Sequence, residues 1–304
     1  MLTKELGNLS GSVGARWRDY YALTKPGVVQ LLVFTAIVGM FLATPGLVAW
    51  DVLVAASLGI GLAAAAGAVV NQVLDQRIDA QMARTRNRPL PQGRIGGRDA
   101  LAFAMGLGLS GLTMLVLFVN ALTAALTFTS LIGYAVVYTV FLKRATPQNI
   151  VIGGAAGAAP PVLGWAAVTN AVDPHALLLF LIIFTWTPPH FWALAIARRT
   201  DYERVDIPML PVTHGEALTK SFVVYYTILL IIVTVLPYIT GMTGLFYLFG
   251  ALLLGGGFLY YALKLKFAPG QDSPMTTFRY SISYLMALFS FLLIDHYIPA
   301  IWPQ

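Results

Sequence analysis

The sequence predicts an all-α, polytopic membrane protein with nine transmembrane helices and a cytoplasmic N-terminus. Three observations carry this prediction: very few charges, long charge-free runs, and Lys and Arg confined to alternate connections. The 304 residues are 58% hydrophobic and 11% charged, whereas soluble domains carry about 25% charged residues. The mean hydropathy of +0.75 agrees with a chain that lies mostly in lipid.

The charge-free runs define the expected spans. A transmembrane helix needs about 20 apolar residues, because the hydrocarbon core is roughly 30 Å thick. Two runs are too long for one span each, and we expect them to turn at Asn120 and within residues 237–244. The runs are 26–50, 52–74, 100–142, 145–172, 174–197, 221–263 and 280–294. With two turns added, they give nine spans.

The positions of the basic residues predict the orientation. With nine spans and the N-terminus inside, all 19 Lys and Arg fall on the cytoplasmic side or its boundary, as the positive-inside rule requires. The net charge of +6 therefore reflects topology and anionic lipid, not nucleic acid. The absence of cysteine excludes disulfides and thiolate sites. We interpret residues 1–24 as a cytoplasmic leader and 25–304 as one membrane domain, since the leader shows neither a secretory signal nor a transit-peptide pattern.

A polar stripe follows the second span, in "NQVLDQRIDAQMARTRNRPLPQGRI". Asn71, Asp75 and Asp79 are spaced i, i+4 and i+8, which places them on one face of a helix. Carboxylate and amide oxygens of this kind suit Mg2+ better than a soft metal.

Arginines follow the stripe directly. Arg84, Arg86 and Arg88, beside a magnesium site at a membrane, favour a diphosphate head on an apolar tail as the ligand. The alternative is that both aspartates are solvated and pair with Arg77 and Arg84 in a loop made basic by topology.

A second acidic cluster lies on the same predicted side. "RRTDYERVDIPMLPV" contains Asp201, Glu203 and Asp206, and two facing clusters could hold two Mg2+ ions across a diphosphate. The alternative is a charged surface turn held by prolines. Lys143 and Arg144, after the fourth span, are either interface anchors or donors to phosphate.

The sixth span carries a histidine. In "FTWTPPHFWALAI" the proline pair 188–189 is expected to break the helix, and His190 lies roughly 10 Å from its inner end at 1.5 Å per residue. An ionisable side chain at that depth is a functional candidate; the alternative is a neutral histidine bonded to a carbonyl that the prolines leave free. Trp186, Phe191 and Trp192 are expected to surround it with aromatic surface, unless they are interface anchors.

The fifth span is rich in small residues. Gly153, Gly154, Gly157 and Gly164 permit close helix contact, and prolines 160–161 interrupt the span. Packing explains this pattern; a wide cavity for a planar substrate is the second interpretation.

Several stretches resemble a known family. The first inner loop is similar to the N-x-x-x-D-x-x-x-D…R-T-x-x-R-P-L signature of the UbiA-type prenyltransferase superfamily. "LTKPGVVQL", "LKRATPQNIVIGGAAGAAPPVLGW", "WTPPHFWALAI" and "DYERVDIPMLPV" resemble, more narrowly, the branch that farnesylates protohaem IX. The resemblance implies a nine-helix bundle with an active site open to the cytoplasm. The lack of a transit-peptide pattern favours the bacterial inner membrane as its location.

The implied reaction joins farnesyl diphosphate to a vinyl group of haem B and adds water, giving haem O and diphosphate. By motif, the resemblance implies a Mg2+ and diphosphate site at Asn71, Asp75, Asp79 and Asp201, diphosphate donors at Arg84, Arg88, Lys143 and Arg144, and haem contacts at His190, Trp192 and His214. The second motif departs from the family's D-x-x-x-D, since Val205 stands four residues after Asp201, so the resemblance assigns no ligand role to Glu203 or Asp206.

Two other functions stay open at this stage. The same scaffold could prenylate another aromatic acceptor, such as a quinone precursor, although the "TPPHFW" block argues against it. A transporter is disfavoured because no Asp, Glu, Lys or Arg is expected at mid-membrane. Haem A synthase and terminal oxidases are expected partners from the family resemblance alone.

Overall fold

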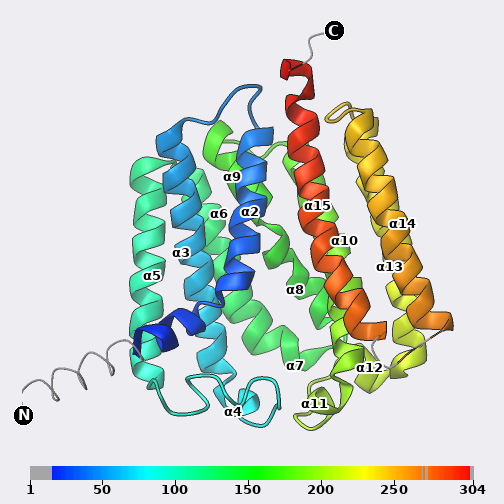
Figure 1. The fold of residues 1–304 in the computed structure, drawn as a ribbon. Coiled ribbons are helices and arrows are strands. Elements are labelled where there is room, and N and C mark those ends of the chain that lie inside the picture. The colour runs from blue at the N-terminus through cyan, green and yellow to red at the C-terminus, as the bar shows by residue number, and fades with distance from the viewer. Residues whose placement is uncertain (1–15, 269, 271–272, 302–304) are drawn as a thin grey trace, which may run out of the picture.

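The protein is a bundle of long helices (Figure 1). The computed structural model describes residues 16–268, 270 and 273–301, and no strand occurs in that part of the chain. A helix at Arg16–Leu23 precedes the labelled elements. These are α2 Pro26–Leu42, α3 Trp50–Leu74, α4 Gln76–Asp79, α5 Gly97–Phe118, α6 Ala121–Ile132, the π-helix η1 Gly133–Leu142, α7 Lys143–Ala145, α8 Asn149–Ala158, α9 Pro160–Thr169, α10 Pro174–Ala197, α11 Arg199–Glu203, α12 Leu210–Thr213, α13 Gly215–Ile239, α14 Leu245–Phe267 and α15 Ser273–Ile301.

The expected spans are confirmed. Eight helices are long and apolar enough to cross a membrane, and a ninth span results if Arg16–Leu23 and Pro26–Leu42 are taken together. The turn at Asn120 is confirmed, because its side chain caps α6 by accepting a hydrogen bond from the Thr123 amide at 2.8 Å. The turn within 237–244 is also confirmed, since α13 ends and α14 begins there.

The first span differs from the straight run 26–50. It bends by 49° between its two helices, at Lys25, which has φ 50° and precedes Pro26. A residue before proline is disfavoured in the α region, so the helix cannot continue through this point. Of the expected leader 1–24, residues 1–15 lie outside the described residues, and the helix that follows pairs Asp19 with Arg94 at 3.1 Å.

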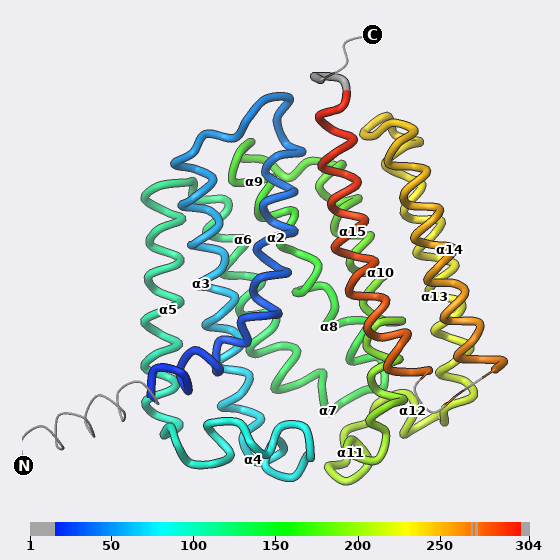
Figure 2. The backbone as a smooth tube through the Cα atoms, viewed as in Figure 1, coloured from blue at the N-terminus to red at the C-terminus, as the bar shows by residue number. Residues whose placement is uncertain are grey.

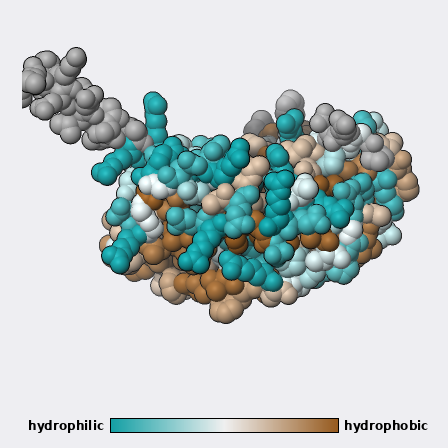
Figure 3. Space-filling view, turned by 90° about the horizontal axis from the view of Figure 1, so that it is seen from below, coloured by the Kyte–Doolittle hydropathy of each residue, from teal (hydrophilic) through white to brown (hydrophobic). Residues whose placement is uncertain are grey.

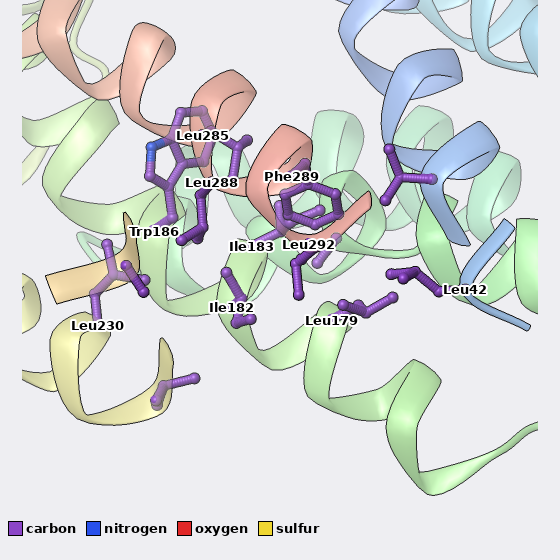
Figure 4. Close-up of a cluster of buried hydrophobic side chains, with 14 of the residues drawn as sticks. Leu42, Leu179, Ile182, Ile183, Trp186, Leu230, Leu285, Leu288, Phe289 and Leu292 are labelled. Carbon is purple, nitrogen blue, oxygen red and sulfur yellow. The ribbon is translucent and has the colours of Figure 1, made fainter. Parts of the chain in front are cut away.

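The largest buried cluster lies where α10 meets α13, α14 and α15 (Figure 4). Trp186 and Ile182 of α10 pack there against Leu285 and Phe289 of α15. A second cluster joins α2, α3, α5 and α9 around Ile60. The helix α2 contributes to both clusters, which ties the two halves of the bundle together.

The proline pair 188–189 does not break the sixth span, so that expectation is wrong: α10 runs unbroken from Pro174 to Ala197. A proline has no backbone N–H, so a carbonyl of the preceding turn loses its hydrogen-bond partner. A carbonyl without a partner is better tolerated than an N–H without one. Neighbouring helices cover α10, and 67% of its most apolar stretch is buried. This packing keeps the helix intact through the two prolines. Prolines 160–161 do separate α8 from α9.

Close helix contact in the fifth span is confirmed at specific glycines. A Cβ at Gly164 would overlap the Ala36 carbonyl of α2, and one at Gly153 would overlap the Tyr138 ring. Gly157, by contrast, faces open space. Backbone-to-backbone contact between α2 and α9 therefore depends on Gly164.

We expect Gly164→Ala to lower the stability of the protein by about 1–3 kcal/mol, because the Ala36 backbone cannot move aside as a flexible side chain would. Thermal unfolding in detergent would measure the loss. Gly157→Ala, in the same small-residue span, is the matched control and should change stability little. Equal stability of both variants would show that α2 and α9 are not held this closely.

Candidate active site

Both inner loops lie at one end of the bundle, which we call the loop end: residues 75–97 and 198–214. Figure 2 shows α4 and α11 beside each other there, and Figure 3 shows hydrophilic side chains gathered on that face. A buried cluster joins the loops, with Met82 from the first packed against Tyr202, Ile207 and Met209 from the second. The sequence-based expectation that the loops meet is therefore confirmed.

The polar stripe keeps its helical spacing although α3 ends at Leu74. The Asp75 amide donates to the Asn71 carbonyl at 3.0 Å, and the Asp79 amide donates to the Asp75 carbonyl at 2.8 Å. On the same face, Asn71 Nδ2 donates to Asp75 Oδ2 at 3.0 Å. Asp75 and Asp79 are only 4% and 5% exposed, so they are not the solvated carboxylates of the alternative interpretation.

Both carboxylates of the polar stripe are paired with a cation. Lys143 Nζ lies 2.5 Å from Asp75 Oδ2, and Arg88 Nη1 lies 2.7 Å from Asp79 Oδ2. The partners suggested by the alternative, Arg77 and Arg84, form neither of these pairs. A buried carboxylate without a cation would be costly, so these two pairs hold the loop end together.

Lys25 is a site residue that the sequence reasoning missed. Its ammonium donates to Asn71 Oδ1 at 2.7 Å. The bend of the first span at Lys25 therefore lies next to the polar stripe. The positive φ of Lys25 is a strained conformation of the kind found at functional sites. The "TKPG" stretch was the available signal, since a proline directly after the lysine fixes the start of α2.

The π-helix η1 also contacts the stripe. Thr139 Oγ1 donates to the Tyr134 carbonyl five residues earlier at 2.8 Å and accepts from Asn71 Nδ2 at 3.2 Å. Wide helical turns of this type are frequent at functional sites. Here η1 directs Thr139 toward Asn71 and is followed directly by Lys143.

One oxygen of the stripe fits a hard cation. Asp75 Oδ1 is buried and accepts no hydrogen bond from the described residues, although such oxygens are normally satisfied. No group of three or more His, Cys, Asp or Glu that could hold a metal occurs in the described part of the chain. This donor set matches Mg2+, which commonly takes one or two carboxylates and completes its shell with water and phosphate oxygens.

In the second loop, only the first acidic residue is buried. Asp201 is 8% exposed, whereas Glu203 and Asp206 are exposed. Burial raises the pKa of the neighbouring Tyr202, and the nearby charge of Arg84 opposes that shift. Arg84 therefore lies at the contact between the two loops. Arg144 is exposed and forms no ion pair with a described residue.

His190 lies in an aromatic sandwich inside the bundle. Its ring stacks on Trp186 at 4.2 Å and on Phe278 of α15 at 4.5 Å between centroids, with Phe191 edge-on at 5.1 Å. Its Nδ1 lies 2.6 Å from Ser281 Oγ, so the alternative bond to a carbonyl left free by the prolines is not the one formed. Phe278 and Ser281 were missed because they lie about 90 residues away in the sequence.

Trp192 does not surround His190, which corrects the expectation. It packs against Phe222 and Tyr226 in a separate buried cluster, because residues i and i+2 of a helix do not face each other. His214 is exposed at the loop end, with Nδ1 2.8 Å from Thr213 Oγ1.

Comparison with known proteins identifies the family. The model of the UbiA prenyltransferase family matches residues 32–291. The chain belongs to the UbiA prenyltransferase family. A protoheme IX farnesyltransferase of Alkalilimnicola ehrlichii is 60% identical over 293 residues, covering 96% of this chain and 97% of that protein. One of Methylococcus capsulatus is 60% identical over 298 residues, covering 98% and 99%.

Solved structures share the UbiA fold. A digeranylgeranylglyceryl phosphate synthase structure has a TM-score of 0.76 at 18% identity and covers 93% of this chain and 99% of its own. A UbiA homologue of Archaeoglobus fulgidus, bound to DMAPP and Mg2+, has a TM-score of 0.60 at 15% identity and covers 90% and 99%. At these identities the likeness concerns the fold alone.

We expect Lys143→Met to lower the stability of the ligand-free protein by about 1–3 kcal/mol, because it leaves the Asp75 carboxylate buried without its cation. Arg144→Met, one residue along and exposed, is the control and should have little effect. Thermal unfolding in detergent would compare the two. A loss of equal size in both variants would mean that Lys143 acts only as an interface anchor.

Proposed function

We propose that the chain transfers a farnesyl group from farnesyl diphosphate to a vinyl group of haem B, with addition of water, giving haem O and diphosphate. The observation that carries this proposal is the 60% identity, over almost the whole chain, to relatives named protoheme IX farnesyltransferase. The paired carboxylates and cations at the loop end support it, because a diphosphate ester requires both a metal and donors.

In this proposal the polar stripe holds the diphosphate through a magnesium ion. Asp75 and Asp79, with Asn71 beside them, would be its ligands, and Asp201 would approach from the second loop. The bound Mg2+ would neutralise charge on the diphosphate as it leaves. The orphaned Asp75 Oδ1 supports the assignment.

Basic side chains would bind the diphosphate oxygens. The proposed donors are Lys25, Arg84, Arg88, Lys143 and Arg144. Lys143 and Arg88 already lie beside the carboxylates, so they can contact a diphosphate bound there with little rearrangement. Donors held in place before the reaction stabilise the leaving group most effectively.

The chemistry then follows from loss of the diphosphate. The allylic C–O bond breaks, its electron pair leaves with the diphosphate, and the vinyl π electrons of haem form the new C–C bond to the farnesyl cation. Water adds to the carbon next to the macrocycle and loses a proton. Bulk water must be kept from the farnesyl cation until the C–C bond has formed, which a helix bundle in lipid allows, and the single water of the addition step enters only afterwards.

The haem end of the proposal centres on His190, whose buried aromatic surroundings suit a flat macrocycle. Trp192 and His214 remain proposed haem contacts from the family resemblance. For Trp192 the role would be indirect, since its side chain is buried between α10 and α13.

The proposal also includes the orientation of the protein in the membrane. The loop end, which gathers the basic residues, would face the cytoplasm of a bacterium, with the N-terminus on that side. Haem A synthase or a terminal oxidase would accept the product.

The reaction can be tested with purified protein, haem B, farnesyl diphosphate and Mg2+. We expect mass spectrometry of the extracted haem to show the mass of farnesyl plus water added. Asp75→Asn should reduce the product at least about 100-fold, since it removes a ligand from the leaving-group site. Asp99→Asn is the control, because Asp99 is exposed in the first turn of α5. Unmodified haem, with prenylation of a quinone precursor instead, would favour the second acceptor class.

Removing divalent metal should abolish the same reaction. We expect EDTA to stop product formation and excess Mg2+ to restore it, because the stripe offers only hard oxygen ligands. The rate of diphosphate release, followed as chelator is titrated, would measure this. Full activity in EDTA would show that Lys and Arg alone stabilise the leaving group.

A further inference from the structure

One hydrogen-bond chain connects His190 of α10 to α15. His190 Nδ1 lies 2.6 Å from Ser281 Oγ, and Ser281 Oγ lies 2.6 Å from the Phe278 carbonyl oxygen, to which it donates. Ser281 is fully buried. Both separations are short enough to require a hydrogen between the two atoms.

These two contacts determine which nitrogen of His190 carries the hydrogen. A carbonyl has no hydrogen to give, so the only hydroxyl hydrogen of Ser281 points at Phe278. The hydrogen between Ser281 and His190 must then belong to the imidazole. His190 is therefore protonated at Nδ1, and Ser281 is the acceptor.

The second nitrogen is left with a lone pair. His190 is 7% exposed and forms no ion pair with a carboxylate of the described residues, so its surroundings favour the neutral ring. Its Nε2 has no hydrogen-bond partner in that part of the chain. Nδ1–H donated to the protein, with Nε2 free, is the arrangement that metal-ligating histidines show.

Two stacked rings also fix the plane of the His190 ring. Trp186 and Phe278 cover its two faces at interplanar angles of 20° and 28°. The Trp186 indole is itself anchored, because its Nε1 donates to the Ser281 carbonyl at 2.8 Å. Ser281 therefore positions His190 both through its hydroxyl and through the ring stacked on it.

We propose that Ser281 is a positioning residue, which holds His190 in the Nδ1–H form and presents the Nε2 lone pair to the iron of the bound acceptor haem. The identity of the ligand rests on the proposed function, whereas the tautomer does not.

The tautomer can be tested without haem, by 15N NMR of histidine-labelled protein in detergent near pH 8. The chain has four histidines, and His190→Gln assigns the signal. We expect a protonated Nδ1 in the wild type and a shift toward protonated Nε2 in Ser281→Ala. Ser290→Ala removes a comparable serine-to-carbonyl bond of α15, to Met286, and should leave the His190 signal unchanged. A wild-type ring protonated at Nε2 overturns the inference, even in a protein that forms haem O.

The iron contact is tested by titrating haem B and recording optical and EPR spectra. We expect a histidine-ligated spectrum that His190→Gln abolishes, and about 10-fold weaker haem binding in Ser281→Ala. Ser281→Thr keeps a hydroxyl that can bond the preceding turn, and should restore both the spectrum and the affinity. An unchanged spectrum and affinity in Ser281→Ala overturns the positioning role. A wild type with the expected tautomer that binds no haem B, yet prenylates another acceptor, overturns the iron contact together with the proposed function.

Discussion

Two carboxylates taken out of water at the end of α3 constrain the rest of the loop end. Asp75 and Asp79 are almost fully buried, and a buried charge is stable only if it is paired and hydrogen-bonded. Their partners come from separate parts of the chain: Lys143 follows η1, and Arg88 lies in the first loop. Lys25, at the start of α2, reaches the same network through Asn71. Satisfying two charges thus fixes α2, α3, η1 and the loop relative to one another.

Under the proposed function, the same pairing would suit a ligand that brings both charges together. A metal alone would compete with Lys143 for Asp75, and a diphosphate alone would meet two carboxylates. If both arrived as one complex, Asp75 and Asp79 would hold the metal, and Lys143 and Arg88 would contact the phosphate oxygens. Few of these charged groups would then be left without a partner, so binding would carry little desolvation penalty. Asp75 Oδ1, which accepts no hydrogen bond from the described residues, would be free to bind the metal without losing a partner.

Sequence reasoning succeeded where spacing along one element decides the geometry. The nine spans, the stripe at i, i+4 and i+8, and the meeting of the two loops all follow from periodicity and topology. It failed for pairs distant in the chain, such as Lys25 with Asn71 and Ser281 with His190. It also predicted a helix break at the proline pair 188–189 that does not occur, since packing keeps α10 helical there. The placement of Trp192 was an avoidable error, because its i+2 spacing already directs it away from His190.

The two parts of the site obtain rigidity in different ways, and each suits the depth at which it lies. At the loop end, where water and headgroups can stabilise ions, Lys143 and Arg88 orient carboxylates through charge. Deeper in the bundle a charge would be costly, and His190 is held by stacked rings and a neutral hydrogen bond. A polyanionic head and a planar, aromatic acceptor need these two environments side by side. One chain supplies both because α10 passes from the aromatic interior to the second acidic loop in a single unbroken helix.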